Sequence, residues 1–254
     1  MGTVTGIKLS IAALVLTFIV VVVGAYVRLS DAGLSCPDWP GCYGYLLAPT
    51  AESTVAIANE AFPGQPVHVG KAWKEMVHRY LAGLLGIIIL SLAIFSLRPQ
   101  GYCLSRPLTW FLVVLVLAQA TLGMLTVTML LKPIIVTGHL LGGLTTLALV
   151  TWLSLSALNR PRTITWRPIR PLIVPVIALV ILYLQIGSGG WTSTNYAALA
   201  CPDFPTCHGS YWPAMDLKSG FNFEREVGRD ANGSWLGREA MTAIHWVHLS
   251  LIHI

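Results

Sequence analysis

Long apolar runs, separated by shorter polar segments, dominate the chain. A helix that crosses a membrane needs about 20 mostly apolar residues. Five runs meet this requirement: residues 11–27, 80–97, 108–131, 134–158 and 172–191. A sixth run begins near Ala240 and reaches Ile254. The first run is too long for the core of a signal peptide and lacks a small-residue cleavage site, so we expect it to be a retained helix.

Composition agrees with this pattern. Hydrophobic residues make up 55% of the chain and charged residues only 11%, whereas a soluble domain carries about 25% charged residues. The net charge of +5 is spread over short segments, without a basic patch that contains aromatic residues, which argues against nucleic-acid binding. The sequence therefore predicts an all-α polytopic membrane protein with about six spans.

The distribution of charge predicts the orientation in the membrane. Lys and Arg in short loops mark the cytoplasmic side. The loops at 98–107 and 159–170 contain six arginines and no acid, while all eleven acids lie in or beside the long segments 28–75 and 192–239. We therefore expect a multi-pass protein of the bacterial cytoplasmic membrane. Its N-terminus is predicted to be cytoplasmic and its long loops to face the periplasm or the exterior.

The cysteines follow the same division. Cys36 and Cys42 lie in one outward loop, Cys201 and Cys207 lie in the other, and Cys103 lies alone in a cytoplasmic loop. Disulfides persist in oxidising compartments, and thiols stay reduced in the cytosol. Two local disulfides in the outward loops are the simpler interpretation. Four unpaired thiols remain the alternative, because spacing alone does not establish disulfide geometry.

The two outward loops repeat each other. Residues 33–44 match residues 198–209 at an offset of 165, with seven matched positions in the pattern Cys-Pro-Asp-aromatic-Pro-x-Cys-x-Gly. Gly24 and Gly189 match at the same offset. A repeat of this period, with four spans in its first copy, predicts two similarly built four-helix bundles.

The repeat also predicts the domain organisation. The first half is expected at 1–160, with the substrate site described below, and a partial second half at 161–254. The second half is expected to be incomplete in this sequence, because only its first span and part of its second are present. Residues 249–254 resemble a translated sequencing-library end, so we expect them to be foreign to the repeat.

Histidines at membrane depth are costly and therefore point to function. His78 opens the second span and His139 lies early in the fourth, and both helices run inward from the outer face. Two histidines on facing helices of a bundle are a common way to hold haem iron. Alternatively, each histidine bonds to a neighbour and the nearby glycines only allow close helix packing. Small residues follow on the same faces and predict a flat slot for a planar ligand: Ala82, Gly86, Gly142 and Gly143.

Two charged residues accompany His78. Glu75 precedes it by three residues and so shares its helix face; it can orient a ligand, relay protons or bind the reacting edge of a substrate. Arg79 adjoins it and can pair with an acidic group such as a haem propionate. The alternatives are an interfacial carboxylate in water for Glu75 and an ordinary interfacial anchor for Arg79.

The second copy contains a matching histidine. His248 follows Cys207 by 41 residues, as His78 follows Cys42 by 36. His248 is therefore the predicted counterpart of His78, and His245 occupies the position of Glu75. The repeat predicts one bis-histidine site in each half, of which this sequence contains three of the four ligands.

These residues resemble the haem A synthase family. The resemblance rests on residues 24–42 (GAYVRLSDAGLSCPDWPGC), on Glu75-x-x-His78-Arg79, on Thr137-Gly-His139 and on the repeated Cys loop, and it covers the chain to His248. It implies an eight-helix membrane enzyme, an oxidoreductase built from two four-helix halves. Such an enzyme oxidises the C8 methyl group of haem O to the formyl group of haem A, for use in terminal oxidases.

Carried over to this sequence, the resemblance implies a role for each candidate residue. His78 and His139, with Arg79, would line the site for the substrate haem O, and Glu75 would be the catalytic residue beside it. His248 would be an axial ligand of a haem b cofactor. The resemblance also implies two outward cysteine pairs, Cys36–Cys42 and Cys201–Cys207.

The sequence departs from the family in two respects. Leu249 stands where the family has arginine, and the last two helices with the fourth histidine are not part of the sequence. The implied partners are membrane lipid, haem O, the haem O synthase that supplies it and an electron donor that the sequence does not identify. Whether the chain forms a homo-oligomer is open.

Two other functions remain open at the level of sequence. A bis-histidine electron carrier would use the same haem ligands but would not need Glu75. A transporter would explain the repeat, but transporters of this kind usually contain broken helices at the membrane midplane, and the central spans lack such breaks.

Overall fold

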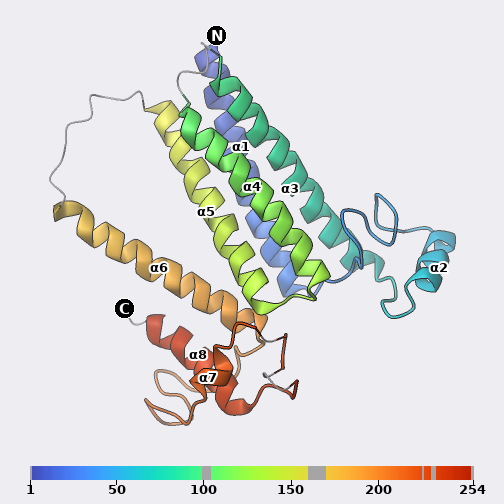
Figure 1. Ribbon diagram of the computed structural model, residues 1–254, viewed down its shortest axis with the longest axis vertical. Coiled ribbons are helices and arrows are strands. Elements are labelled where there is room, and N and C mark those ends of the chain that lie inside the picture. The colour runs from blue at the N-terminus through green and yellow to red at the C-terminus, as the bar shows by residue number, and fades with distance from the viewer. Residues whose placement is uncertain (1, 99–103, 160–169, 225, 230–232, 253–254) are drawn as a thin grey trace. The chain divides into compact units, whose positions relative to one another are not determined.

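The computed structural model describes residues 2–98, 104–159, 170–224, 226–229 and 233–252. Within these ranges it contains eight helices and no named strand (Figure 1). Five of the helices are long and apolar enough to cross a membrane. The prediction of an all-α polytopic membrane protein is confirmed. The predicted cytoplasmic cysteine, Cys103, and three of the six loop arginines, Arg160, Arg162 and Arg167, lie outside the described residues.

The five long helices are α1 (Gly2–Leu29), α3 (Val69–Ser96), α4 (Arg106–Thr128), α5 (Pro133–Leu158) and α6 (Arg170–Thr194). Helix α3 begins at Val69, well before the predicted start at Tyr80, because hydropathy marks only the apolar part of a helix whose first turns are polar. Helix α4 ends before the predicted Leu131. Leu130 and Leu131 have φ angles of 49° and 58°, which are incompatible with a right-handed helix.

Three shorter helices belong to the polar segments and to the end of the chain. They are α2 (Glu52–Ala61), α7 (Leu217–Gly220) and α8 (Arg238–Ile252). The sequence did not predict α2, whose one fully buried residue, Ala58, packs with the first cysteine pair and with Met76 of α3. Helix α8 forms the predicted sixth apolar segment and is 15 residues long.

The structure divides into two compact units, each described separately. The first comprises residues 1–129 and 142–164. In it α1 packs against α3, and α3 packs against α4 (Figure 1). The later part of α5 joins them, and Ser154 Oγ donates a hydrogen bond to the Ser10 carbonyl of α1 at 3.0 Å. The apolar core of this bundle is formed by Ala13, Leu85, Ile89, Leu92, Leu104, Leu112, Val150, Leu153 and Ala157.

The second unit comprises residues 130–141 and 165–254. Helix α8 packs against α6 and α7. A small core of Trp191, Ala197, Leu236, Ala240 and Ile244 lies at the loop end of these helices. The unit boundary places residues 130–141 with the second unit, whereas the sequence repeat predicts halves at 1–160 and 161–254; the assignment of halves stays a prediction.

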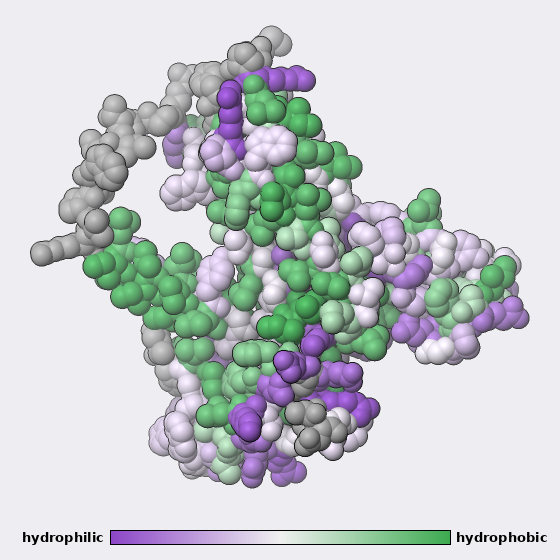
Figure 2. All heavy atoms as spheres, in the orientation of Figure 1, coloured by the Kyte–Doolittle hydropathy of each residue, from purple (hydrophilic) through white to green (hydrophobic). Residues whose placement is uncertain are grey.

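The outward faces of the long helices are apolar. Figure 2 shows hydrophobic side chains along the helices and hydrophilic ones mainly on the loops and helix ends. Large apolar side chains such as Phe18 and Val174 are more than half exposed. A helix that is apolar all round is typical of a membrane span, so lipid accounts for this surface.

Candidate functional site

The first Cys loop, residues 33–45, is closed by a disulfide. Cys36 is bonded to Cys42, and the backbones of Cys42 and Tyr45 form a two-way bridge, with N–O distances of 2.8 and 3.1 Å. Both cysteines are fully buried. The structure therefore contains the first of the two predicted cysteine pairs.

Asp38 fixes the turn inside this loop. Its carboxylate accepts hydrogen bonds from the backbone N–H groups of Tyr43, at 2.6 Å, and Gly44, at 2.8 Å. Tyr43 and Gly44 both have positive φ angles, so this turn needs such a side-chain acceptor to hold an otherwise uncommon backbone conformation.

The second Cys loop, residues 198–210, has the same construction. Cys201 is bonded to Cys207, and Asp203 accepts hydrogen bonds from the backbone N–H groups of His208 and Gly209. Hydrogen bonding, first from the Thr206 side chain and then from Gly209, lowers the pKa of Asp203 below its ordinary value. The repeat is thus present in the hydrogen bonds as well as in the sequence.

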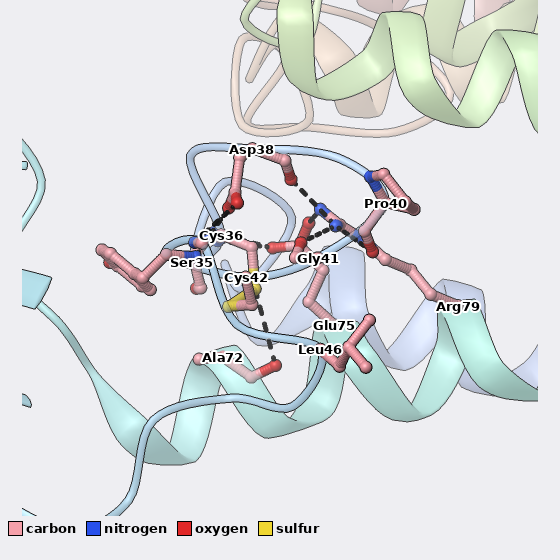
Figure 3. Close-up of a disulfide and its surroundings, with 12 residues drawn as sticks. Ser35, Cys36, Asp38, Pro40, Gly41, Cys42, Leu46, Ala72, Glu75 and Arg79 are labelled. Carbon is pink, nitrogen blue, oxygen red and sulfur yellow. Dashed lines mark hydrogen bonds and ion pairs between the residues drawn. A yellow bond between two sulfur atoms is a disulfide. The ribbon is translucent and has the colours of Figure 1, made fainter. Parts of the chain in front are cut away.

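Glu75 anchors the first Cys loop to α3. Its side chain is buried, with 4% of the residue exposed. One carboxylate oxygen, Oε2, accepts hydrogen bonds from the backbone N–H groups of Ser35 at 2.9 Å and Cys36 at 3.0 Å. The other oxygen forms an ion pair with Arg79. Figure 3 shows the carboxylate between the loop and the arginine, so the alternative of a water-exposed interfacial carboxylate does not describe Glu75.

Arg79 completes the anchor. Its Nη1 donates hydrogen bonds to three loop carbonyls, those of Asp38 at 2.9 Å, Pro40 at 3.3 Å and Gly41 at 2.6 Å (Figure 3). The side chain is only 13% exposed. The predicted pairing of Arg79 with a haem propionate stays a prediction, because the structure shows the guanidinium bound to the loop and to Glu75.

The second half uses a histidine in place of this carboxylate. His245 Nδ1 accepts a hydrogen bond from the backbone N–H of Cys201 at 3.0 Å, as Glu75 does from the N–H of Cys36. Each acceptor thus binds the first cysteine of its own loop. The sequence left the role of His245 open. In the structure His245 holds the second Cys loop, as Glu75 holds the first.

His78 lies against a glycine of the preceding span. A Cβ atom placed on Gly24 would be 2.8 Å from His78 Cε1, so only glycine allows the ring to approach α1 this closely. His78 Nδ1 is buried and has no hydrogen-bond partner within the described part of the chain. The ring hydrogen-bonds instead to the backbone of Val20 on α1, as expected from the alternative in which the histidine bonds to a neighbour.

His248 lies against α6 in the same manner. A Cβ atom on Gly189 would be 3.0 Å from His248 Cε1. Unlike His78, this ring has partners at Nδ1: Ser188 Oγ at 3.0 Å and Gln185 Nε2 at 3.2 Å. The contacts of Ser188 and Gln185 with His248 were not predicted from the sequence. Two polar residues one turn apart in an apolar span are the signal that would have indicated them.

The close contact between His78 and Gly24 predicts that one added methyl group at Gly24 destabilises the protein. Gly24→Ala should destabilise the protein by about 1–3 kcal/mol, the typical cost of overpacking, because the added methyl group overlaps the imidazole. Gly83→Ala on α3 is the matched control, since a Cβ there would meet nothing within 4 Å. Unfolding in detergent measures both variants, and equal stabilities would contradict the close contact.

The structure fills part of the predicted slot beside His139. A Cβ atom on Gly142 would be 1.8 Å from Gln119 Nε2, so the Gln119 amide of α4 occupies the space that the sequence assigned to a planar ligand. His139 itself belongs to the second compact unit and His78 to the first. Their pairing stays a prediction.

An apolar groove runs between α6 and α8. Its volume is about 660 Å³, and it is lined by side chains that include Ile177, Ile181, Leu251 and Gln185. Ligand sites for small molecules and cofactors have volumes of about 300–1,000 Å³ and are mostly apolar with a few polar groups. The groove is apolar but open, and Leu251 is one of the residues that the sequence predicts to be foreign to the repeat, so the groove alone does not identify a ligand site. Gln185, which also lines it, contacts His248.

Comparison with known proteins identifies the family. The model of the cytochrome oxidase assembly protein family matches residues 8–251. The chain belongs to this family. The matched range includes both Cys loops and the three candidate histidines, so the features described above lie within the part of the chain that the family model matches.

Curated relatives agree with the family assignment. The chain is 44% identical over 212 residues to a protein of Shewanella oneidensis named heme A synthase, covering 82% of this chain and 63% of that protein. Proteins of the same name from Erythrobacter litoralis and Halalkalibacterium halodurans are 30% and 28% identical, over 68% and 66% of their lengths. The resemblance to the haem A synthase family is confirmed, and the chain spans about two thirds of these relatives.

Proposed function

We propose that this family member makes haem A, by oxidising the C8 methyl group of haem O to a formyl group for terminal oxidases. The observation that carries the proposal is the repeated contact of one helix histidine with one glycine of the preceding span, beside an anchored Cys loop. Relatives named heme A synthase have up to 44% identity to the chain among those compared, which supports the same chemistry here.

The residues of the chain fit haem as a ligand. Among the described residues, His78 Nδ1 is buried without a hydrogen-bond partner, and His248 has hydrogen-bond partners at Nδ1. In the proposal, His78 and His139 hold the substrate haem O, and His248 is an axial ligand of a haem b cofactor. The haem iron supplies the redox chemistry that an unreactive methyl group requires.

The protein groups then have defined tasks. Histidines orient the porphyrin, and apolar helices accommodate the isoprenoid tail of haem O. Glu75, one helical turn before His78, is the proposed catalytic residue at the reacting edge, held in place by Ser35, Cys36 and Arg79. Two successive hydroxylations of the methyl group would each take one oxygen atom from an oxygen-supplying oxidant and would give a geminal diol. Loss of water from this diol would give the aldehyde.

The proposal includes a location and partners. We assign the protein to the bacterial cytoplasmic membrane, with its N-terminus in the cytoplasm and both disulfide-containing loops outside. The substrate comes from a haem O synthase, and an electron donor completes the reaction. The two disulfides support the placement of both loops on the oxidising side of the membrane.

Pigment analysis tests the function. The complete gene that encodes this chain is expressed in cells that make haem O but no haem A, and the extracted haems are identified by mass. We expect haem A with the native sequence and haem O alone with Glu75→Gln. An electron carrier would leave haem O unchanged in both cases, and this result would refute the proposal.

A further inference from the structure

We propose that Gln185 and Ser188 are positioning residues for His248, and that they hold its imidazole with the proton on Nδ1 and the Nε2 lone pair available to iron. The first half has no such residues beside His78. The link to iron rests on the proposed function, whereas the protonation of the ring does not.

The hydroxyl of Ser188 decides which ring nitrogen carries the proton. Ser188 Oγ donates a hydrogen bond to the Gln185 backbone carbonyl at 2.9 Å. A hydroxyl has a single proton, so towards His248 Nδ1, at 3.0 Å, the oxygen acts as an acceptor. Nδ1 is therefore the donor. In a neutral imidazole the other nitrogen, Nε2, then has the free lone pair that a metal requires.

The Gln185 amide supports the same assignment. Its Nε2 lies 3.2 Å from His248 Nδ1, and its Oε1 is buried without a partner in the ranges that the structure describes. The two ends of an amide are assigned from the hydrogen-bond network. Turning the amide by half a rotation places Oε1 towards the Nδ1–H group, so that Nδ1–H has two acceptors, and moves Nε2 to the buried position that Oε1 occupied.

The first half lacks both groups. At the repeat offset of 165, Gln185 corresponds to Val20 and Ser188 to Val23. His78 lies on Gly24 as His248 lies on Gly189, but His78 Nδ1 is buried with no hydrogen-bond partner. The two halves therefore share the position of the ring and differ in what holds its second nitrogen.

This difference suits the two haems of the proposed reaction. An acceptor on Nδ1–H fixes the ring and raises the basicity of the ligand, and loss of such a partner typically costs about 10–100-fold in metal affinity. A cofactor has to stay bound, and His248 has the supported ring. A substrate has to arrive and leave, and the ring of His78 has no side-chain partner at Nδ1 among the described residues, although it hydrogen-bonds to the backbone of Val20.

The first test needs no haem. The chain is labelled with ¹⁵N-histidine and placed in lipid nanodiscs, and the ¹⁵N shifts of His248 show which nitrogen is protonated. We expect the Nδ1–H form in the native chain and in Ser188→Thr, which keeps the hydroxyl. The double variant Ser188→Ala/Gln185→Leu should lose it. Thr194→Val is the control, because Thr194 Oγ1 bonds only to the backbone of its own helix. An Nε2–H form in the native chain would overturn the proposal.

The second test measures the consequence for iron. In the product of the complete gene, with His78→Ala and His139→Ala, the remaining site is titrated with ferric haem b. Ser188→Ala/Gln185→Leu should weaken ferric binding about tenfold relative to Ser188→Thr. Ferrous binding should change less, so the midpoint potential should rise; a tenfold difference between the two states corresponds to about 59 mV. Unchanged affinity and potential would overturn the proposal. Absence of haem binding in every variant would instead refute the proposed function and leave the protonation result standing.

Discussion

Glu75→Ala is expected to release the first Cys loop from α3 and to destabilise the protein by about 3–5 kcal/mol, the range for breaking one side of a buried ion pair. The substitution leaves the guanidinium of Arg79 without its carboxylate. It also leaves the backbone N–H groups of Ser35 and Cys36 without their acceptor. Unfolding in detergent and the rate of proteolysis within residues 33–45 measure the two effects.

Two variants separate this structural role from chemistry. Glu52→Ala on the exposed start of α2 is the control for loss of a carboxylate. Glu75→Gln retains one oxygen for both N–H groups, since Ser35 and Cys36 share Oε2. It replaces the oxygen that accepts from Arg79 by an NH2 group, so the charge and this hydrogen bond are lost. We expect it to keep the loop largely protected while it loses haem A formation. A Glu75→Ala protein as stable as Glu52→Ala would show that the anchor carries no stability.

The second large effect concerns the histidines. His78→Ala should remove binding of the substrate haem while the haem ligated by His248 stays, and His248→Ala should do the reverse. The reason is that each ring lies against the span of its own half, Gly24 in one case and Gly189 in the other. Absorption spectra and haem content of the purified variants of the complete gene product measure the two sites.

His208→Ala provides the control for the histidine variants, because His208 is exposed in the second Cys loop. It should keep full haem content. Loss of all haem from His78→Ala alone would show that the two sites are not independent. Retention of all haem by both His78→Ala and His248→Ala would remove these histidines from the site.

Hydropathy predicted the membrane spans because lipid selects long apolar helices regardless of the details of packing. It placed the start of α3 too late, at Tyr80, because the first turns of this helix contain Lys71, Lys74 and Glu75. These turns are helical because they pack against the Cys loop, as the burial of Ala72 and Met76 shows. This burial depends on tertiary contacts, so a search for apolar runs in the sequence does not detect these helical turns.

The candidate site was predictable where the chain repeats itself. The offset of 165 joined Gly24 to Gly189, and the similar spacing of the two histidines from their Cys loops predicted His248 as the counterpart of His78. The repeat could not reveal which groups form hydrogen bonds or contacts with each side chain. Glu75 and Arg79 bind loop backbone, and Gln119 fills the space at Gly142. Partners of this kind depend on three-dimensional distance between residues more than 20 positions apart.

One measurement tests the central claim most directly, that helix histidines of this chain bind haem iron. The purified chain in nanodiscs is titrated with ferric haem b and followed by absorption. The account predicts a sharp, saturable Soret band of low-spin iron that is lost when His78, His139 and His248 are all replaced by alanine. A chain that stays colourless, or a band unchanged in the triple variant, would contradict it.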